Sequence, residues 1–334
     1  MIASRIYQDF YGLREKPFNL TPDPKFLCLT EKHQEALDHL TYGLEQKTGF
    51  ILFLGEVGAG KTTVCRALLE RLDQEYVVAL ILHPFLAEEN LLASIIRDLG
   101  LVPGGESKRE LLEQLNAFIL ARKVEGKTVA IIFDESQNLS PKALEEIRIL
   151  SNLETDKEKL LQIILIGQKE LEAKLARQEL RQLNQRIGVR YYLNPLNREE
   201  TGRYLAHRLQ VAGDPGTIHF VKGAVREIFY FSKGIPRLIN LAADRTLLAG
   251  YVKGTKTLTR EMAGRGIRSL SSRPDPQERR LPQESLTPAS LLVLAFVVLG
   301  GFFLLWAMSH YWEWWEAPNK FILTIPAGFL REHA

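Results

Sequence analysis

The first two-thirds of the chain alternate between short apolar runs and longer segments of helical periodicity. The apolar runs lie at 50–54, 76–82, 128–133, 160–166 and 189–193. They are rich in β-branched residues, which is typical of strands buried on both faces of a parallel sheet. Helical patterns separate them near 62–73, 88–99, 107–123, 140–152 and 169–184. This alternation predicts an α/β domain in which helices flank a parallel sheet.

The pattern changes at Pro195, after which the strand-like runs stop. Helical patterns continue at 197–212, 221–232 and 236–250. We therefore expect an α/β domain at 1–194, which includes an N-terminal extension, and a small all-helical lid domain at 195–265.

Residues 289–308 form a 20-residue stretch without a charged side chain. A helix of that length spans about 30 Å, which is the thickness of the hydrocarbon layer of a bilayer. We predict one transmembrane helix at 289–309. A flexible tether at 266–288, with four prolines, precedes it, and a short tail at 310–334 follows it.

The residues around this stretch predict its orientation. Arginines precede it, glutamates follow it, and aromatic residues gather at its C-terminal end. They are Arg273, Arg279 and Arg280, then Glu313 and Glu316, and Trp306, Tyr311, Trp312, Trp314 and Trp315. By the positive-inside rule the N-terminal domains lie in the cytoplasm, and the chain crosses the inner membrane once.

A glycine-rich motif follows the first apolar run. Residues 55–62 match the phosphate-binding pattern G-x-x-x-x-G-K-[ST]. Backbone N–H groups of such a loop surround a phosphate, and the next helix directs its positive dipole end at the anion. Lys61 is expected to reach the β- and γ-phosphates, and Thr62 to bind Mg²⁺. The expected ATP ligands are Gly55, Glu56, Val57, Gly58, Ala59, Gly60, Lys61, Thr62 and Thr63.

Two carboxylates follow the third apolar run, at Asp134 and Glu135. The carboxyl ends of parallel strands are where α/β sheets build their sites. Asp134 is placed to hold Mg²⁺ through water, as a Walker B aspartate does. Glu135 is the candidate base that polarises the attacking water. The alternative is that this pair only begins a helix, for which Ser136 and Asn138 offer further caps. The phosphate-binding loop upstream favours hydrolysis of ATP.

The charge composition bears on the kind of partner that the chain binds. The chain has 43 basic and 40 acidic residues and a net charge of +3, so no global field attracts a polyanion, and a nucleic-acid partner is not expected. Its two cysteines, Cys28 and Cys65, are too few for a disulfide framework.

Further segments place the chain near a known family. Tyr11-Gly12-Leu13, Lys16-Pro17-Phe18, Pro22-Asp23-Pro24 and His33-Gln34-Glu35-Ala36-Leu37 precede the phosphate-binding loop; the segments at 133–139 and 234–240 follow it. In this combination residues 7 to about 262 resemble the AAA+ ATPases of the general secretion pathway protein A type, including relatives linked to exosortase and exopolysaccharide loci. The resemblance implies a P-loop AAA+ fold, a homo-oligomeric ring and partners in envelope secretion or export machinery.

The resemblance also implies roles for single residues. Arg237 matches the lid arginine called sensor 2, which touches the γ-phosphate. Gln168 follows the fourth apolar run, where the family places the polar sensor 1 residue, although asparagine or threonine is usual there. Arg186 and Arg181 lie where AAA+ proteins keep the finger arginine that completes the neighbouring subunit's site, and Arg186 is favoured by its position just before the fifth run.

Three functions fit these observations. The first is a membrane-tethered AAA+ ATPase that hydrolyses ATP to assemble or drive an envelope secretion or export system. The second is a DNA-associated ATPase of the transposition or helicase-loader type, which the membrane stretch and the near-neutral charge disfavour. The third is a nucleotide-gated scaffold that does not hydrolyse ATP.

Overall fold

The computed structural model describes residues 7–21, 23–26, 28–72, 74–82, 84, 90–153, 159–271, 299–301, 303–304 and 306–308. The chain divides into two units by its contacts, 1–272 and 273–334. All of the contacts and sites below lie within the first unit.

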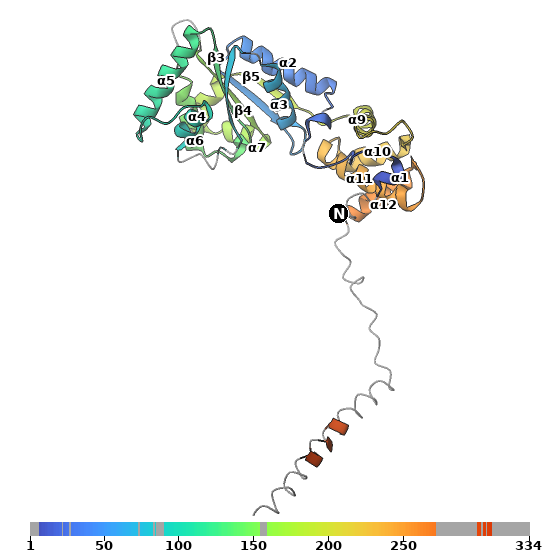
Figure 1. Ribbon diagram of the computed structural model, residues 1–334. Helices are drawn as coiled ribbons and strands as arrows, with labels where there is room; N and C mark the ends of the chain where they lie inside the picture. The colour runs from blue at the N-terminus through green and yellow to red at the C-terminus, as the bar shows by residue number, and fades with distance from the viewer. Residues whose placement is uncertain are drawn as a thin grey trace, which may run out of the picture. The chain divides into compact units, whose positions relative to one another are not determined.

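A five-stranded parallel sheet occupies the centre of the α/β domain (Figure 1). Its strand order is β2-β3-β4-β1-β5. The strands are β1 (Phe50–Gly55), β2 (Tyr76–Ile81), β3 (Thr128–Phe133), β4 (Leu161–Gly167) and β5 (Ile187–Leu193). Strands β1 and β4 are buried at every position and β3 at all but its first, which explains their mostly apolar sequences. The polar residue in β4, Gln162, is buried as well, and its Oε1 accepts from the Gly49 N–H at 2.9 Å. All five predicted strands are confirmed to within two residues.

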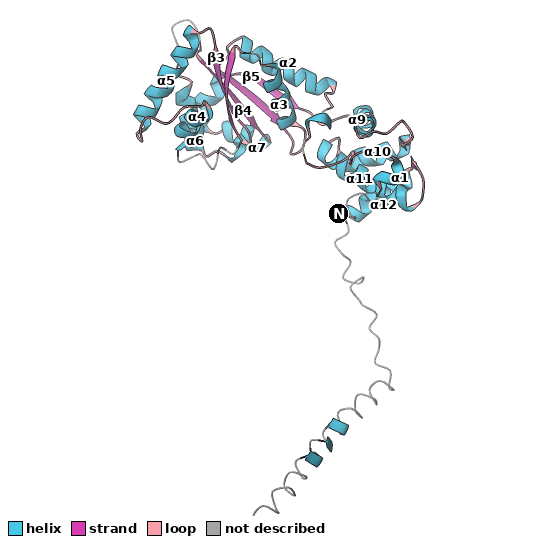
Figure 2. Ribbon diagram, viewed as in Figure 1, coloured by secondary structure: helices cyan, strands magenta, loops and turns pink. Residues whose placement is uncertain are grey.

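Helices cover both faces of this sheet (Figure 2). Helices α2 (Glu31–Glu45) and α3 (Lys61–Arg71) pack against Ile51 and Phe53 of β1. On the other face, the alternate β1 residues Phe50 and Leu52 share a core with helices α4 (Leu91–Asp98), α5 (Lys108–Val124), α6 (Pro141–Leu150) and α7 (Lys169–Leu175). Because successive side chains of a strand point to opposite faces of the sheet, β1 contributes to two separate cores.

The helix predicted at 169–184 is wrong as a single element. The structure has α7, the 3₁₀ turn η5 (Gln178–Leu180) and helix α8 (Arg181–Arg186) in its place. Arg177 adopts extended backbone angles, with ψ of 149°. This break redirects the chain, so that Leu180 and Leu183 both enter the core beneath the sheet.

The second domain contains helices α9 (Arg198–Val211), α10 (Lys222–Ser232), α11 (Pro236–Val252) and α12 (Arg260–Ser271). Two corrections apply to the sequence prediction. The domain is not all-helical, because two short parallel strands, β6 (His219–Phe220) and β7 (Thr257–Leu258), pair between the helices. Helix α12 also passes the predicted end at 265, since Ile267 packs against the domain's core.

The N-terminal segment packs with this second domain, not with the sheet. It contains α1 (Gln8–Tyr11) and the turn η2 (Pro24–Phe26). The apolar side chains of the segment share one core with those of α9, α10 and α11. The segment contributes Tyr7, Tyr11, Leu13, Phe18 and Phe26 to this core. Assigning the N-terminal extension to the α/β domain at 1–194 was therefore wrong, because its stabilising contacts are with residues about 200 positions later.

None of the helices in the described ranges is long and apolar enough to cross a bilayer. The transmembrane helix predicted at 289–309 lies mostly outside those ranges, as do most of the tether at 266–288 and the tail at 310–334.

Replacing Tyr11 by alanine tests the docking of the N-terminal segment. Tyr11 is fully buried, and its hydroxyl donates to the Leu247 carbonyl at 2.9 Å. We expect Tyr11→Ala to lower the free energy of unfolding by about 3–5 kcal/mol, as aromatic truncations in cores do. Tyr230→Ala, at an exposed position of α10, should change it by less than about 0.5 kcal/mol. Urea titration followed by circular dichroism measures both; equal values would contradict the packing.

Candidate nucleotide-binding site

The glycine-rich loop lies between β1 and α3, as its motif requires. Gly58 and Gly60 have φ of +76° and +107°, in the left-handed region that glycine tolerates. A Cβ on Gly58 would also lie 2.6 Å from Cβ of Arg237. Lys61 is the first residue of α3, and its Nζ donates to the carbonyls of Gly55 at 2.9 Å and Glu56 at 3.1 Å. The loop thus holds its lysine folded back over its own turn.

Burial and neighbouring charges oppose each other at Lys61. Burial lowers the pKa of its amine, and the carboxylates of Glu135 and Asp134 raise it. Burial is the larger effect, so the pKa lies below its ordinary value. A cation that has lost most of its hydration is prepared to interact strongly with a phosphate.

Thr62 and Asp134 meet at the foot of this loop. The Thr62 hydroxyl donates to Oδ2 of Asp134 at 3.0 Å, and the Glu135 N–H donates to Oδ1 at 2.8 Å. Asp134 is buried, and burial raises the pKa of its carboxyl. A hydroxyl and a carboxylate are hard oxygen ligands of the kind that Mg²⁺ prefers. The two predicted metal ligands are therefore together, and their chemistry fits the ion.

Glu135 adopts a left-handed backbone conformation, with φ of +52°. Its Oε2 accepts from Nε2 of Gln137 at 2.5 Å and from Nε2 of Gln168 at 3.3 Å. A non-glycine residue with positive φ is uncommon and occurs often at functional sites. Gln168 occupies the N-cap position of α7 directly after β4, and its side chain bonds to Glu135, so the predicted sensor 1 position does reach the predicted base. Sequence reasoning gave Gln137 no role, because its contact depends on the turn that Glu135 makes.

One pocket joins the loop to the lid. It is lined by Val57, Gly58, Gly60, Lys61, Thr62, Thr63 and Glu135 from the α/β domain, by Tyr204, Arg208, Pro236, Arg237 and Asn240 from the lid, and by Asn19, Leu20 and Thr21 from the N-terminal segment. The Arg237 N–H approaches the Gly58 carbonyl at 3.4 Å. The predicted sensor 2 residue therefore lies against the phosphate-binding loop.

Glu56 is held away from the lysine of its own loop. It accepts from Lys169 Nζ at 2.7 Å and from the Tyr192 hydroxyl at 2.9 Å. The hydrogen bond from Lys169 is the largest cause that lowers the pKa of this carboxyl. Because its side chain is engaged, Glu56 can serve a nucleotide only through its backbone. Ala59 is buried inside the loop.

The two candidate finger arginines differ. Arg186 Nη1 donates to Ser151 Oγ at 2.6 Å, to Asn152 Oδ1 at 2.7 Å and to the Arg148 carbonyl at 3.4 Å, so it caps the C-terminal end of α6 in its own subunit. Arg181 is exposed, and its side chain makes no hydrogen bond or ion pair with another described residue. The structure brings neither of them into the pocket.

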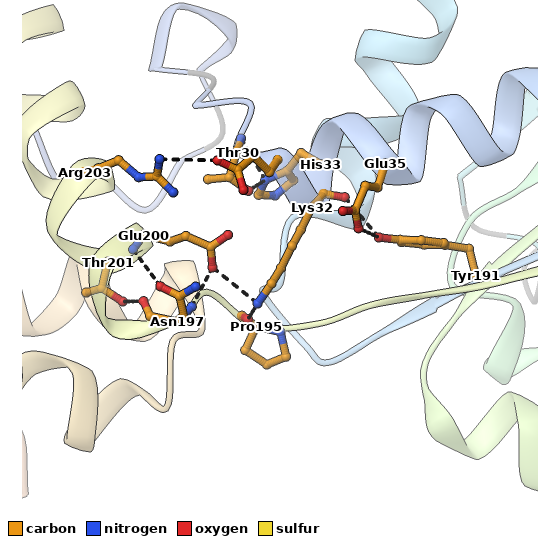
Figure 3. Close-up of polar contacts among 11 residues, drawn as sticks. Thr30, Lys32, His33, Glu35, Tyr191, Pro195, Asn197, Glu200, Thr201 and Arg203 are labelled. Carbon is orange, nitrogen blue, oxygen red and sulfur yellow. Dashed lines mark hydrogen bonds and ion pairs between the residues drawn. The ribbon is translucent and has the colours of Figure 1, made fainter.

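A set of polar contacts joins α2, the loop after β5 and α9, and we call it the α2–α9 joint (Figure 3). Lys32 Nζ donates to the Pro195 carbonyl at 2.6 Å and pairs with Glu200 at 3.2 Å. Glu200 is buried and also accepts from the Asn197 N–H at 2.6 Å. The next residue, His33, is bonded through Nδ1 to the Thr30 hydroxyl at 2.8 Å. A Cβ on Gly60 would lie 3.0 Å from Nε2 of His33, so the joint reaches the back of the phosphate-binding loop.

Comparison with known proteins agrees with this geometry. Residues 44–175 match the AAA domain family. General secretion pathway protein A of Aeromonas hydrophila is 46% identical over 251 residues, which are 75% of this chain and 46% of that protein. The chain thus spans about half the length of this curated relative.

Solved structures share the fold. The Aeropyrum pernix ORC2 protein, in ADPNP-ADP complexes, has a TM-score of 0.56 and 17% identity, over 76% of this chain and 71% of that chain. Cdc6p from Pyrobaculum aerophilum has a TM-score of 0.54 and 18% identity, over 76% of this chain and 70% of that chain. At these identities the likeness concerns the fold alone.

His33 predicts a pH dependence of stability. Burial lowers its pKa from the ordinary 6.5, so the folded protein holds this proton less well than the unfolded chain. Its contribution is therefore complete above the ordinary pKa and is lost as the pH falls through and below it, by up to about 1.4 kcal/mol per pH unit. The difference in unfolding free energy between the wild type and His33→Gln should thus shrink from pH 7.5 to pH 5. If the unfolding free energies of the wild type and His33→Gln, measured by urea titration, differ by the same amount at every pH, the buried imidazole of His33 is not held in its neutral form.

Proposed function

This chain belongs to the AAA ATPases of the general secretion pathway protein A type, and we propose that it hydrolyses ATP to assemble or drive an envelope secretion or export system. The observation that supports hydrolysis most directly is the convergence of Thr62, Asp134 and Glu135 beside the lysine of the phosphate-binding loop.

In this proposal each group has one task. The loop's N–H groups and Lys61 bind the β- and γ-phosphates, and Lys61 exchanges its bonds to Gly55 and Glu56 for phosphate oxygens. Thr62 and Asp134 hold Mg²⁺, which neutralises charge that develops on the phosphates. Arg237 reports the γ-phosphate to the lid, since it belongs to the first turn of α11 and its N–H approaches the Gly58 carbonyl of the loop.

Glu135 is the base in this proposal, and its two amide partners orient it. Gln137 and Gln168 both donate to Oε2, while Oε1 has no hydrogen bond to a described residue. Oε1 is therefore the oxygen that can accept a proton from water. Because a fixed base loses no rotational freedom when the reaction begins, this arrangement favours catalysis.

The membrane and the oligomer are also part of the proposal. The uncharged stretch at 289–308 would tether the ATPase to the inner membrane, with the α/β and lid domains in the cytoplasm. The name of the Aeromonas relative supports secretion machinery as the partner. A homo-oligomeric ring would let an arginine of one subunit complete its neighbour's site.

Two substitutions separate binding from hydrolysis. Lys61→Ala should abolish ATP binding, measured by titration with a fluorescent ATP analogue, because it removes the cation at the phosphates. Glu135→Gln should preserve binding and lower turnover by about 100-fold or more, the typical effect of losing a positioned base. Lys142→Ala, an exposed lysine of α6, is the control and should change neither. A Glu135→Gln variant with wild-type turnover would instead support a scaffold that does not hydrolyse ATP.

Mixed oligomers test the finger arginine. Arg186→Ala or Arg181→Ala should lower turnover and leave ATP binding intact, and an arginine finger can contribute about 10³–10⁵ in rate. Mixing the inactive arginine variant with inactive Lys61→Ala should restore part of the turnover, because some interfaces then pair an intact loop with an intact arginine. We expect Arg186→Ala to lose thermal stability as well, since it caps α6, whereas Arg181→Ala should not. Native mass spectrometry confirms that mixed oligomers form. If ATP turnover recovers with neither arginine variant in such oligomers, neither arginine acts on the neighbouring subunit.

A further inference from the structure

The pocket extends beyond the residues assigned to the phosphates. Its lining includes the loop residues and Glu135, and also Leu20, Tyr204, Arg208 and Asn240. Arg237 and Asn240 lie three residues apart on α11, which is a rise of about 4.5 Å along the helix. Arg237 contacts the loop, so Asn240 lies further from the phosphate site, where the nucleoside of a bound nucleotide would extend.

Arg208 organises this part of the pocket. It is 7% exposed, and no carboxylate of a described residue pairs with it. Its Nε donates to the Pro17 carbonyl at 2.5 Å and its Nη2 to the Asn19 carbonyl at 3.4 Å. Its guanidinium also lies 4.6 Å from the centre of the Phe26 ring. Arg208 therefore fixes the N-terminal segment against α9.

The same arginine sets the direction of a hydrogen-bond chain. Arg208 Nη1 donates to the Tyr204 hydroxyl at 3.1 Å, and that hydroxyl lies 3.0 Å from Oδ1 of Asn240. A guanidinium can only donate, so the tyrosine oxygen accepts there and sends its own proton to Asn240. Burial raises the pKa of the Tyr204 phenol, so the hydroxyl keeps that proton.

The orientation of the Asn240 amide follows from this chain. Because Oδ1 accepts from Tyr204, the Nδ2 amide is the other end of the side chain, and it has no acceptor among the described residues. Asn240 is only 6% exposed and lines the pocket. The side chain thus keeps a free donor at the pocket wall, and a ligand that displaces water from the pocket would have to accept from it.

We infer that Asn240 is a specificity-determining residue of the nucleotide site, whose amide donates to a ring nitrogen of a purine base. The inference rests on the proposed function, because it requires that a nucleotide occupies the pocket. Leu20 and the Tyr204 ring offer apolar surface for a base beside the donor. Arg208 and Tyr204 are positioning residues, since they fix the orientation of the Asn240 amide.

The test is a thermodynamic cycle between the amide and the base. Competition against a fluorescent ATP analogue gives the affinities of the 334-residue protein, in detergent, for ATP, 1-deaza-ATP, 3-deaza-ATP, 7-deaza-ATP and 2′-deoxy-ATP. One hydrogen bond between neutral groups corresponds to about a 3- to 10-fold change in affinity. We expect one deaza analogue to bind the wild type more weakly than ATP by this factor. Asn240→Ala should remove that difference and leave the difference between ATP and 2′-deoxy-ATP unchanged.

A second variant, Tyr204→Phe, keeps the inference testable if Asn240→Ala does not fold. Tyr204→Phe keeps the ring but removes the hydroxyl, so the Asn240 amide can rotate, and discrimination against the same deaza analogue should fall. Tyr230→Phe, at an exposed position, is the matched control and should leave all affinities unchanged. Thermal unfolding of each variant shows that it is folded.

The outcomes are distinct. Equal loss of affinity for every analogue in Asn240→Ala would overturn the inference and assign the residue a structural role. A change confined to 2′-deoxy-ATP would also overturn it, because the acceptor would then belong to the ribose. If wild type binds ATP and Lys61→Ala does not, a silent Asn240→Ala rejects only the specificity role. If wild type binds no nucleotide, the proposed function fails with it.

Discussion

The hydrogen bond between Thr62 and Asp134 depends on the order of the strands in the sheet. Thr62 follows β1 and Asp134 follows β3, and β4 lies between these two strands. Because all three run parallel, their carboxyl ends open at one edge, and β4 adds Gln168 beside Glu135. The proposed metal ligands, the proposed base and the amide that hydrogen-bonds to it thus come from three adjacent strands. A strand order in which β3, β4 and β1 were not neighbours would separate them.

The lid depends on a second constraint, the docking of the N-terminal segment. This segment shares the core of α9, α10 and α11, and it also contributes Asn19, Leu20 and Thr21 to the pocket wall. Arg208 connects the two functions, because one guanidinium holds the segment and directs Tyr204. The α2–α9 joint adds a path from the lid to the back of the phosphate-binding loop.

The sequence predicted those features that depend on residues close together in the chain. The five strands were evident because their sequences are mostly apolar, and two of them, β1 and β4, are buried at every position. The loop and the Asp134-Glu135 pair were evident because each motif consists of adjacent residues. The placement of the N-terminal segment was not, since Tyr11 bonds to Leu247 across 236 positions. The break at Arg177 and the roles of Gln137 and Arg208 were missed for a similar reason: each depends on how separate elements pack.

The central claim is that Thr62 and Asp134 hold the divalent ion of a nucleotide. Electron paramagnetic resonance with Mn²⁺ in place of Mg²⁺ tests it directly, in the presence of a non-hydrolysable ATP analogue. The account predicts that wild type binds Mn²⁺ only together with the nucleotide, and that Thr62→Val weakens Mn²⁺ binding at least about 10-fold, since it replaces a ligand hydroxyl by a methyl group of similar volume. Unchanged Mn²⁺ affinity in Thr62→Val, with the analogue still bound, would contradict it.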